Sequence, residues 1–182
     1  VLIYINIFSL SILLRLKIHM KPSPDRRATP VIERYLEFIY LMAVEGQPIY
    51  GARLAKSLHV SRPSVTTTLQ RIVRAGLIKL NARKEIQLTS KGQVLAEYFQ
   101  RRHCIIERWL TEELGLSWEE SDAQAHQLEH AMSDQVAESL NTHLGSPTTC
   151  PHGNPVPGNS ATTTALSKSF QPCNAEEGTR VQ

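Results

Sequence analysis

The chain has 182 residues and a formal net charge of +3. Its length and its hydrophobic content of 41% are enough for one or two small domains with their own cores. Its three cysteines are odd in number and form no Cys-x-x-Cys pair, so no disulfide framework is suggested, and a reducing cytoplasm fits. Residues 53–102 contain 11 Lys and Arg against 2 Asp and Glu, whereas residues 103–140 contain 1 Lys or Arg against 9 Asp and Glu. This separation favours a polyanion partner for the first segment and binding of a cation by the second. The alternative is that the two segments only form solvated surfaces of opposite charge.

The first 28 residues are expected to lie outside any folded domain. Residues 1–19 are apolar, but the run is short for a membrane span, and no small-residue cleavage site follows it. Met20 is followed by the polar segment "KPSPDRR", so we interpret residues 1–19 as translated upstream sequence and Met20 as the natural start. With this interpretation we expect a protein without a membrane partner. The alternative is that residues 1–19 form a signal anchor.

Residues 29–92 are expected to form a winged helix-turn-helix domain. Thr29 can cap a first helix that Gly46 ends, and "YGARLAKSLHV" is predicted to be a short second helix. Ser61 and Pro63 begin the next helix. The segments "IKL" and "IQL" are predicted strands around the basic tip "NARKE". Helix, turn, helix and basic hairpin in this order are typical of a winged helix-turn-helix, whose second helix enters the major groove.

The predicted DNA-binding surface combines hydroxyls and arginines. Serine hydroxyls and free N–H groups at a helix start suit a phosphate, and arginines can neutralise further phosphates. Thr66, Thr67 and Thr68 are small enough to approach base edges. The alternative is that these side chains only cap and solvate a helix of a protein-docking module. We expect contacts to double-stranded DNA from Arg53, Ser61, Arg62, Pro63, Ser64, Thr67, Arg71, Arg74, Arg83 and Lys84.

Residues 93–145 are expected to form a second, helical domain, so that the whole protein is mainly α with a small β-hairpin wing. A long helix begins in the segment "TSKGQ" and ends at Gly115. Ser117 and Glu120 form a capping box, which opens one further helix that we expect to run through residue 144.

The segment "HQLEH" in this further helix is a candidate metal site. His126, Glu129 and His130 are spaced at i, i+3 and i+4, which places them on one face of a helix. The pattern His-x-x-Glu-His is also the inverted zinc-protease motif, with the glutamate as general base. We expect every cysteine to be an inert small side chain, so the donors are imidazole and carboxylate, which suits Mn²⁺ or Fe²⁺. Neighbouring helices offer the further ligands His103, Glu107 and Glu37.

Six segments that follow one another between residues 29 and 157 carry a family resemblance: "ERYLEFIYLMAVEG", "ARLAKSLHVSRPSVTTTLQRIVRAGLI", "LTSKG", "RRHCIIERWLTEELGL", "HQLEHAMSDQV" and "CPHGNPVPG". In this order they resemble the iron- and manganese-dependent repressors, which include the diphtheria toxin repressor and the manganese transport regulator. The resemblance implies a winged helix that binds palindromic operators and two later helices that form a dimer interface. It also implies a metal between the domains that locks the DNA-binding geometry.

The resemblance also assigns individual residues. It places Ser61, Pro63, Ser64 and Thr67 on operator-contacting positions. It places metal ligands at His103, Glu107, Glu129 and His130, with Glu37 on a glutamate ligand of the manganese branch.

Three positions depart from the family pattern. His126 stands where the iron branch has cysteine and the manganese branch glutamate, and Asp122 stands where the iron branch has a histidine of an ancillary site. Arg34 occupies a ligand position, although a guanidinium cannot ligate a metal. We hypothesise that Arg34 replaces one cation of a two-metal cluster and pairs with a carboxylate; the alternative is that it turns to solvent or to a DNA phosphate.

Residues 146–182 are rich in Pro, Gly, Ser and Thr and are expected to be a linker and tail, whose last part resembles the first strand of a truncated SH3-like domain. The sequence as a whole predicts a cytoplasmic, non-enzymatic repressor of metal-uptake genes, which uses Mn²⁺ or Fe²⁺ and binds a palindromic operator as a homodimer. Two alternatives stay open: a metal-dependent hydrolase of the inverted His-x-x-Glu-His type, and a winged-helix regulator that has lost its metal response.

Overall fold

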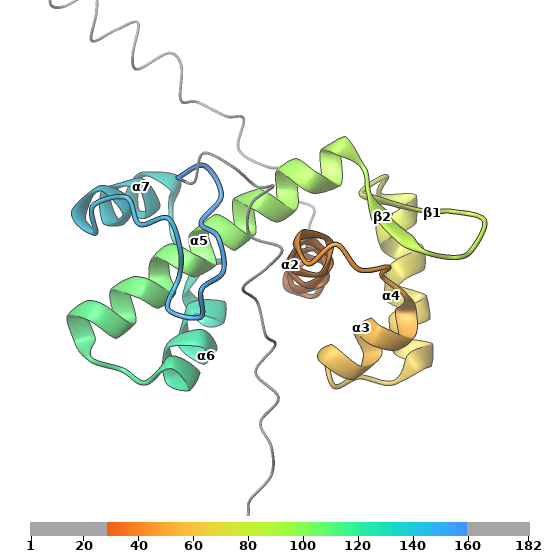
Figure 1. The fold of residues 1–182 in the computed structure, drawn as a ribbon, viewed down its shortest axis with the longest axis horizontal. Coiled ribbons are helices and arrows are strands. Elements are labelled where there is room, and N and C mark those ends of the chain that lie inside the picture. Colours follow the sequence, from red (N-terminus) through yellow and green to blue (C-terminus); the bar gives the residue numbers. More distant parts are fainter. Residues whose placement is uncertain (1–28, 160–182) are drawn as a thin grey trace, which may run out of the picture.

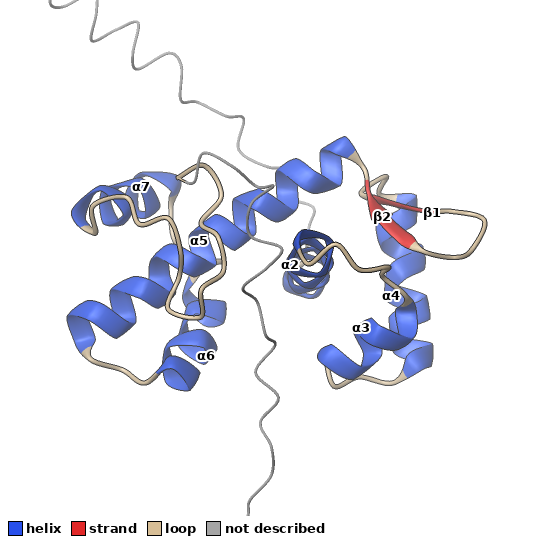
Figure 2. Cartoon of the chain, viewed as in Figure 1, coloured by secondary structure: helices blue, strands red, loops and turns tan. Residues whose placement is uncertain are grey.

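The computed structural model describes residues 29–159 of the protein. The interpretation of residues 1–19 and the suggested SH3-like strand lie outside the described residues. Figure 2 shows a mainly helical chain with one antiparallel hairpin, which confirms the predicted fold class. Within residues 29–159, no helix is both long enough and apolar enough to cross a membrane.

The first domain is a winged helix-turn-helix. The two strands pair antiparallel, with Ile78 opposite Leu88, and form the wing. The apolar sides of the helices enclose one core, in which Leu36, Leu54 and Ile72 are fully buried. The elements are α2 (Pro30–Val44), α3 (Gly51–Ser57), α4 (Arg62–Arg74), β1 (Ile78–Leu80) and β2 (Ile86–Leu88).

One long helix, α5 (Ser90–Leu114), connects the two domains. Its first turns belong to the core of the winged helix through Leu95 and Phe99, and its later turns pack into two smaller clusters of the second domain. Figure 1 shows α5 running from the wing past α2 to the remaining helices. The helix ends at Gly115, as predicted, where the backbone turns left-handed with a φ of 68°.

The predicted single helix over residues 117–144 is wrong, because the structure has two helices there, α6 (Trp118–Leu128) and α7 (Asp134–His143). The hydroxyl of Ser133 accepts the backbone N–H of Val136 at 3.3 Å and caps α7. Arg102 Nε donates to the carbonyl oxygen of Glu129 at 3.1 Å, which gives the end of α6 a partner outside the helix. His126 therefore lies in α6, Glu129 at its C-cap and His130 in the turn that follows.

Gly92 marks a close approach between α5 and the wing. A Cβ at this position would lie 1.8 Å from the carbonyl oxygen of Leu77, a backbone atom that cannot swing aside. We expect Gly92→Ala to lower the free energy of unfolding by about 2–3 kcal/mol in urea denaturation. Gly51→Ala is the control, because its Cβ would meet only side chains of Leu69 and Val65 at 3.7 Å. Equal stability of the two variants would contradict the close approach.

Candidate metal centre

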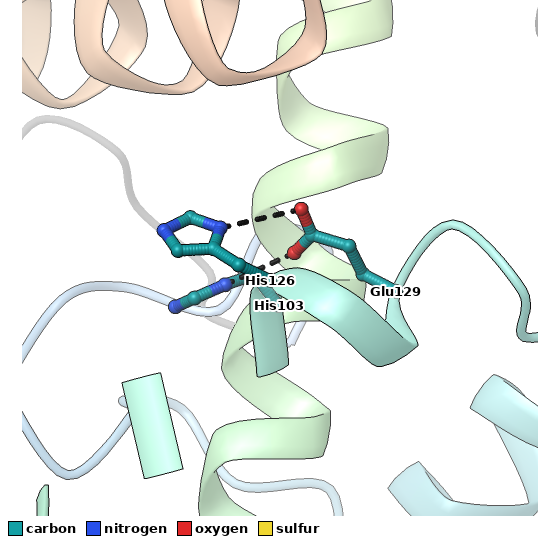
Figure 3. A group of neighbouring side chains, drawn as sticks. All are labelled: His103, His126 and Glu129. Carbon is teal, nitrogen blue, oxygen red and sulfur yellow. Dashed lines mark hydrogen bonds and ion pairs between the residues drawn. The ribbon is translucent and has the colours of Figure 1, made fainter. Parts of the chain in front are cut away.

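The carboxylate of Glu129 is the centre of the site. Its Oε2 lies 3.0 Å from Nδ1 of His103, and its Oε1 lies 3.4 Å from Nδ1 of His126, as Figure 3 shows. Its Oε1 also lies 3.6 Å from Nε2 of His130. His103 comes from α5, and the other three residues come from the end of α6 and the turn after it. A buried carboxylate beside three imidazoles is a donor set that can hold a divalent metal.

The outer nitrogens of two of these imidazoles face a second carboxylate. The rings of His103 and His126 lie 4.4 Å apart and are tilted by 43°. Asp122 Oδ1 lies 3.2 Å from His103 Nε2 and 4.0 Å from His126 Nε2. Each ring thus presents Nδ1 to Glu129 and Nε2 to Asp122. A histidine that ligates a metal usually donates the N–H of its other ring nitrogen to a carboxylate. Asp122 is placed to be this second carboxylate for both rings.

Helix α2 of the first domain brings two further carboxylates to this place. Glu33 Oε2 lies 2.5 Å from Nδ1 of His130. Glu37 is only 3% exposed, and within the described residues neither of its carboxylate oxygens has a hydrogen-bond partner. Burying a carboxylate without hydrogen bonds is costly unless a cation compensates its charge. The unpartnered oxygens of Glu37, which interacts electrostatically with Glu129 and His103, therefore fit a divalent cation.

The pKa values in the centre show how strongly these groups interact. Burial raises the pKa of Glu37 to about 8, and repulsion from Glu129 adds to this effect. Burial lowers the pKa of His103, but hydrogen bonds to Asp122 and Glu129 outweigh it, so this pKa lies well above its usual value. Burial also raises the pKa of Glu129, but hydrogen bonds from His103 and His126 outweigh it and hold this pKa below its usual value. Metal binding would therefore compete with protons for these donors.

Arg34 lies at the open side of the centre. Its guanidinium carbon is 5.7 Å from the centroid of the Phe38 ring, and its positive charge counteracts the rise in the pKa of Glu37. The hypothesis that Arg34 replaces a cation stays a prediction. The pocket at this side has a volume of about 210 Å³ and is lined by Pro30, Val31, Arg34, His126, Glu129 and His130.

A second group of potential ligands lies beside the first. Glu107 Oε2 is 3.9 Å from His103 Nε2, but its other carboxylate oxygen contacts Nδ1 of His152. Cys150 completes a group with Glu107 and His152 whose ligand atoms all lie within 4.8 Å of one another. Sequence reasoning missed Cys150 and His152, because it treated the cysteine as inert. The Cys-x-His spacing in "CPH" was the available signal.

The candidate DNA-binding surface consists of the start and outer side of α4 together with the wing. The hydroxyl of Ser61 accepts the N–H of Ser64 at 3.3 Å and caps α4, as predicted. Thr68 is 7% exposed and faces the core, so the expectation that it approaches base edges is wrong. Arg53 is half-buried and pairs with Glu45 of its own domain. The exposed members of the predicted set are Ser61, Arg62, Pro63, Ser64, Thr67, Arg71, Arg74, Arg83 and Lys84.

Two family models match the chain in the order of its two domains. Residues 27–86 match "Iron dependent repressor, N-terminal DNA binding domain", and residues 89–158 match "Iron dependent repressor, metal binding and dimerisation domain". The iron-dependent repressor IdeR of Mycobacterium leprae is 41% identical over 126 residues, which are 69% of this chain and 55% of that protein. The diphtheria toxin repressor of Corynebacterium diphtheriae is 37% identical over 126 residues, which are 69% of this chain and 56% of that protein.

Solved structures show the same arrangement. The manganese regulator SloR has a TM-score of 0.64 at 30% identity and covers 76% of this chain and 61% of its own. A manganese-dependent transcriptional repressor in complex with manganese has a TM-score of 0.64 at 31% identity and covers 69% of this chain and 58% of its own. The chain spans about half the length of the curated relatives it matches. With both domains matched and the fold shared, the chain belongs to the family of metal-dependent transcriptional repressors that includes the diphtheria toxin repressor and the manganese regulators.

Proposed function

We propose that the protein is a transcriptional repressor that binds its operator when Mn²⁺ or Fe²⁺ occupies the Glu129 centre. In this proposal it acts in the cytoplasm, as a homodimer on a palindromic site, and controls genes of metal uptake. In this proposal the metal regulates DNA binding, and Glu129 acts as a metal ligand and not as the general base of a hydrolase.

The observation that carries this proposal is that the two domains meet at Glu129. The three histidines and Glu129 belong to the second domain, whereas Glu33 and Glu37 belong to α2 of the winged helix. The buried oxygens of Glu37 have no hydrogen-bond partner in the described part of the chain. A cation shared by Glu37 and Glu129 would remove that cost and would favour one arrangement of α2 against α5 and α6.

A bound Mn²⁺ or Fe²⁺ would supply two positive charges to a set of imidazole and carboxylate donors that suits either ion. Glu37 and Glu129 raise each other's energy in the charged state, and both would stay charged beside the ion. The nitrogens of His103 and His126 that face Glu129 would give up any proton they hold. Helix α2 shares its core with α4, so holding α2 in place also holds the DNA-facing helix.

The group of Glu107, Cys150 and His152 supports a second metal position with a different preference. Its thiol would bind as a thiolate, a soft donor, whereas the Glu129 centre has none. The ring of Trp118 lies 5.9 Å from that of His152, so its fluorescence would respond to occupancy of this position.

Metal-dependent operator binding is the decisive test. A palindromic site is first selected from random duplexes in the presence of Mn²⁺, and affinity is then measured by fluorescence anisotropy with Mn²⁺, with anaerobic Fe²⁺ and with chelator. We expect binding to be at least about 10-fold tighter with either metal, and to weaken steeply with salt because phosphate contacts dominate. Arg71→Ala is the control that should weaken DNA binding without changing metal binding.

Other outcomes would support the alternatives. Equal DNA affinity with and without metal would identify a winged-helix regulator that has lost its metal response. Metal-dependent cleavage of a peptide library without retention of DNA would identify a hydrolase. Either result would overturn the proposed function.

A further inference from the structure

We propose that Glu33 is a positioning residue that transmits metal binding to the DNA-binding domain by holding Nδ1 of His130. The inference rests on the proposed function and names the contact through which it operates. Glu33 Oε2 lies 2.5 Å from His130 Nδ1, and the Glu33 side chain is only 11% exposed. The other ring nitrogen of His130, Nε2, faces Glu129 at 3.6 Å. His130 therefore stands between a carboxylate of one domain and a carboxylate of the other.

The three histidines of the centre differ in where their outer nitrogens go. Those of His103 and His126 face Asp122, which lies on α6 in the same domain as the metal centre. That of His130 faces Glu33 on α2. Among the described residues, Glu33 is thus the winged-helix carboxylate that contacts the ring nitrogen of a central histidine facing away from Glu129. Asp122 can orient ligands, but it cannot connect them to the DNA-binding domain.

The protonation chemistry of imidazole makes this contact respond to metal. A neutral imidazole carries a single N–H, on either Nδ1 or Nε2. If Nε2 of His130, which faces Glu129, held the metal, the ring proton would lie on Nδ1, the nitrogen that contacts Glu33. The metal-free ring has the other form available as well. A bound metal would therefore favour the ion-pair contact between His130 and Glu33 of α2, and by reciprocity a docked α2 would favour metal binding.

The surroundings of Glu33 make α2 a rigid transmitter of this contact. Ile32, Tyr35 and Leu36 are buried in the core of the winged helix. Val65 and Ile72 of α4 belong to the same core. Close-packed side chains transmit displacement, so a change in the docking of α2 reaches the DNA-facing helix.

The test compares Glu33→Ala with Asp122→Asn, because both remove an outer carboxylate but only one removes it from the winged helix. For each variant, Mn²⁺ affinity is measured by titration calorimetry, operator affinity is measured without Mn²⁺ and at saturating Mn²⁺, and stability is measured in urea. Glu33→Gln keeps an oxygen acceptor for Nδ1–H. Glu113→Gln is the control, since Glu113 makes an exposed pair with His143 at 3.1 Å, away from the centre.

We expect Asp122→Asn to need about 10- to 100-fold more Mn²⁺ but to reach wild-type operator affinity at saturation. Glu33→Ala should lose about 10-fold in operator affinity even at saturating Mn²⁺, with no loss in its absence, and Glu33→Gln should recover most of this. Wild-type affinity of Glu33→Ala at saturation, or an equal loss with and without Mn²⁺, would overturn the inference while leaving the proposed function intact. A wild-type protein that does not respond to Mn²⁺ would overturn both.

Discussion

Glutamine in place of Glu129 is expected to lower the affinity for Mn²⁺ about 100-fold or more and to abolish metal-dependent operator binding. Three imidazole nitrogens lie within 3.6 Å of the Glu129 carboxylate, so this single group contacts every histidine of the centre. The amide keeps the shape of the side chain but lacks the charge that a divalent ion requires. Loss of an outer partner alone costs about 10- to 100-fold in metal affinity, and a direct ligand should cost more.

Calorimetric titration with Mn²⁺ and operator anisotropy measure this effect. Glu119→Gln is the matched control, because Glu119 lies in the first turn of the same helix and is exposed. Its affinities for metal and operator should equal those of the wild type. Retention of wild-type Mn²⁺ affinity by Glu129→Gln would show that the metal binds elsewhere, with the Glu107 group as the first place to look.

Glu37→Gln is expected to act in opposite directions on stability and on regulation. Burial raises the pKa of Glu37 to about 8 from a usual value of 4.5. Below pH 4.5 the carboxyl is protonated in both the folded and the unfolded state and costs nothing. As the pH rises from 4.5 towards 8, the unfolded state loses its proton first, so the metal-free protein loses stability. Glutamine cannot ionise, so the variant should be more stable near neutral pH, by an amount on the order of a few kcal/mol.

In the presence of Mn²⁺ we expect the wild type to be more stable than Glu37→Gln, because the wild-type carboxylate then binds a cation and the neutral amide binds it less well. Urea denaturation from pH 5 to pH 8, with chelator and with saturating Mn²⁺, measures both effects. The stability of Glu119→Gln should follow the wild type in every condition. A metal-free Glu37→Gln protein whose stability falls with pH as steeply as that of the wild type would refute this assignment of the buried charge.

Local signals were sufficient for several helix ends. Ser61 caps α4 and Gly115 ends α5, as the sequence predicts, because capping and left-handed glycine geometry depend on a few neighbouring residues. The same short range explains the grouping of His126 with Glu129, which are three residues apart at the end of one helix. The prediction of one helix over residues 117–144 is wrong because its break depends on residues that are distant in the sequence. Its break after Leu128 involves the contact of Arg102 with Glu129, which no local pattern contains.

The sequence alone predicts most of the element types, the order of the two domains, the separation of basic and acidic segments and the residues proposed as metal ligands around Glu129. The packing of the helices was needed to show which carboxylate faces which imidazole nitrogen. Glu33 meets His130, and Cys150 meets Glu107, across separations that helical periodicity does not reach. Periodicity specifies the face of a helix, whereas the packing of α2 and α6 and the course of the loop after α7 specify what that face meets. The coupling between metal and DNA proposed for this protein therefore depends on packing between domains, whereas local spacing groups only His126, Glu129 and His130.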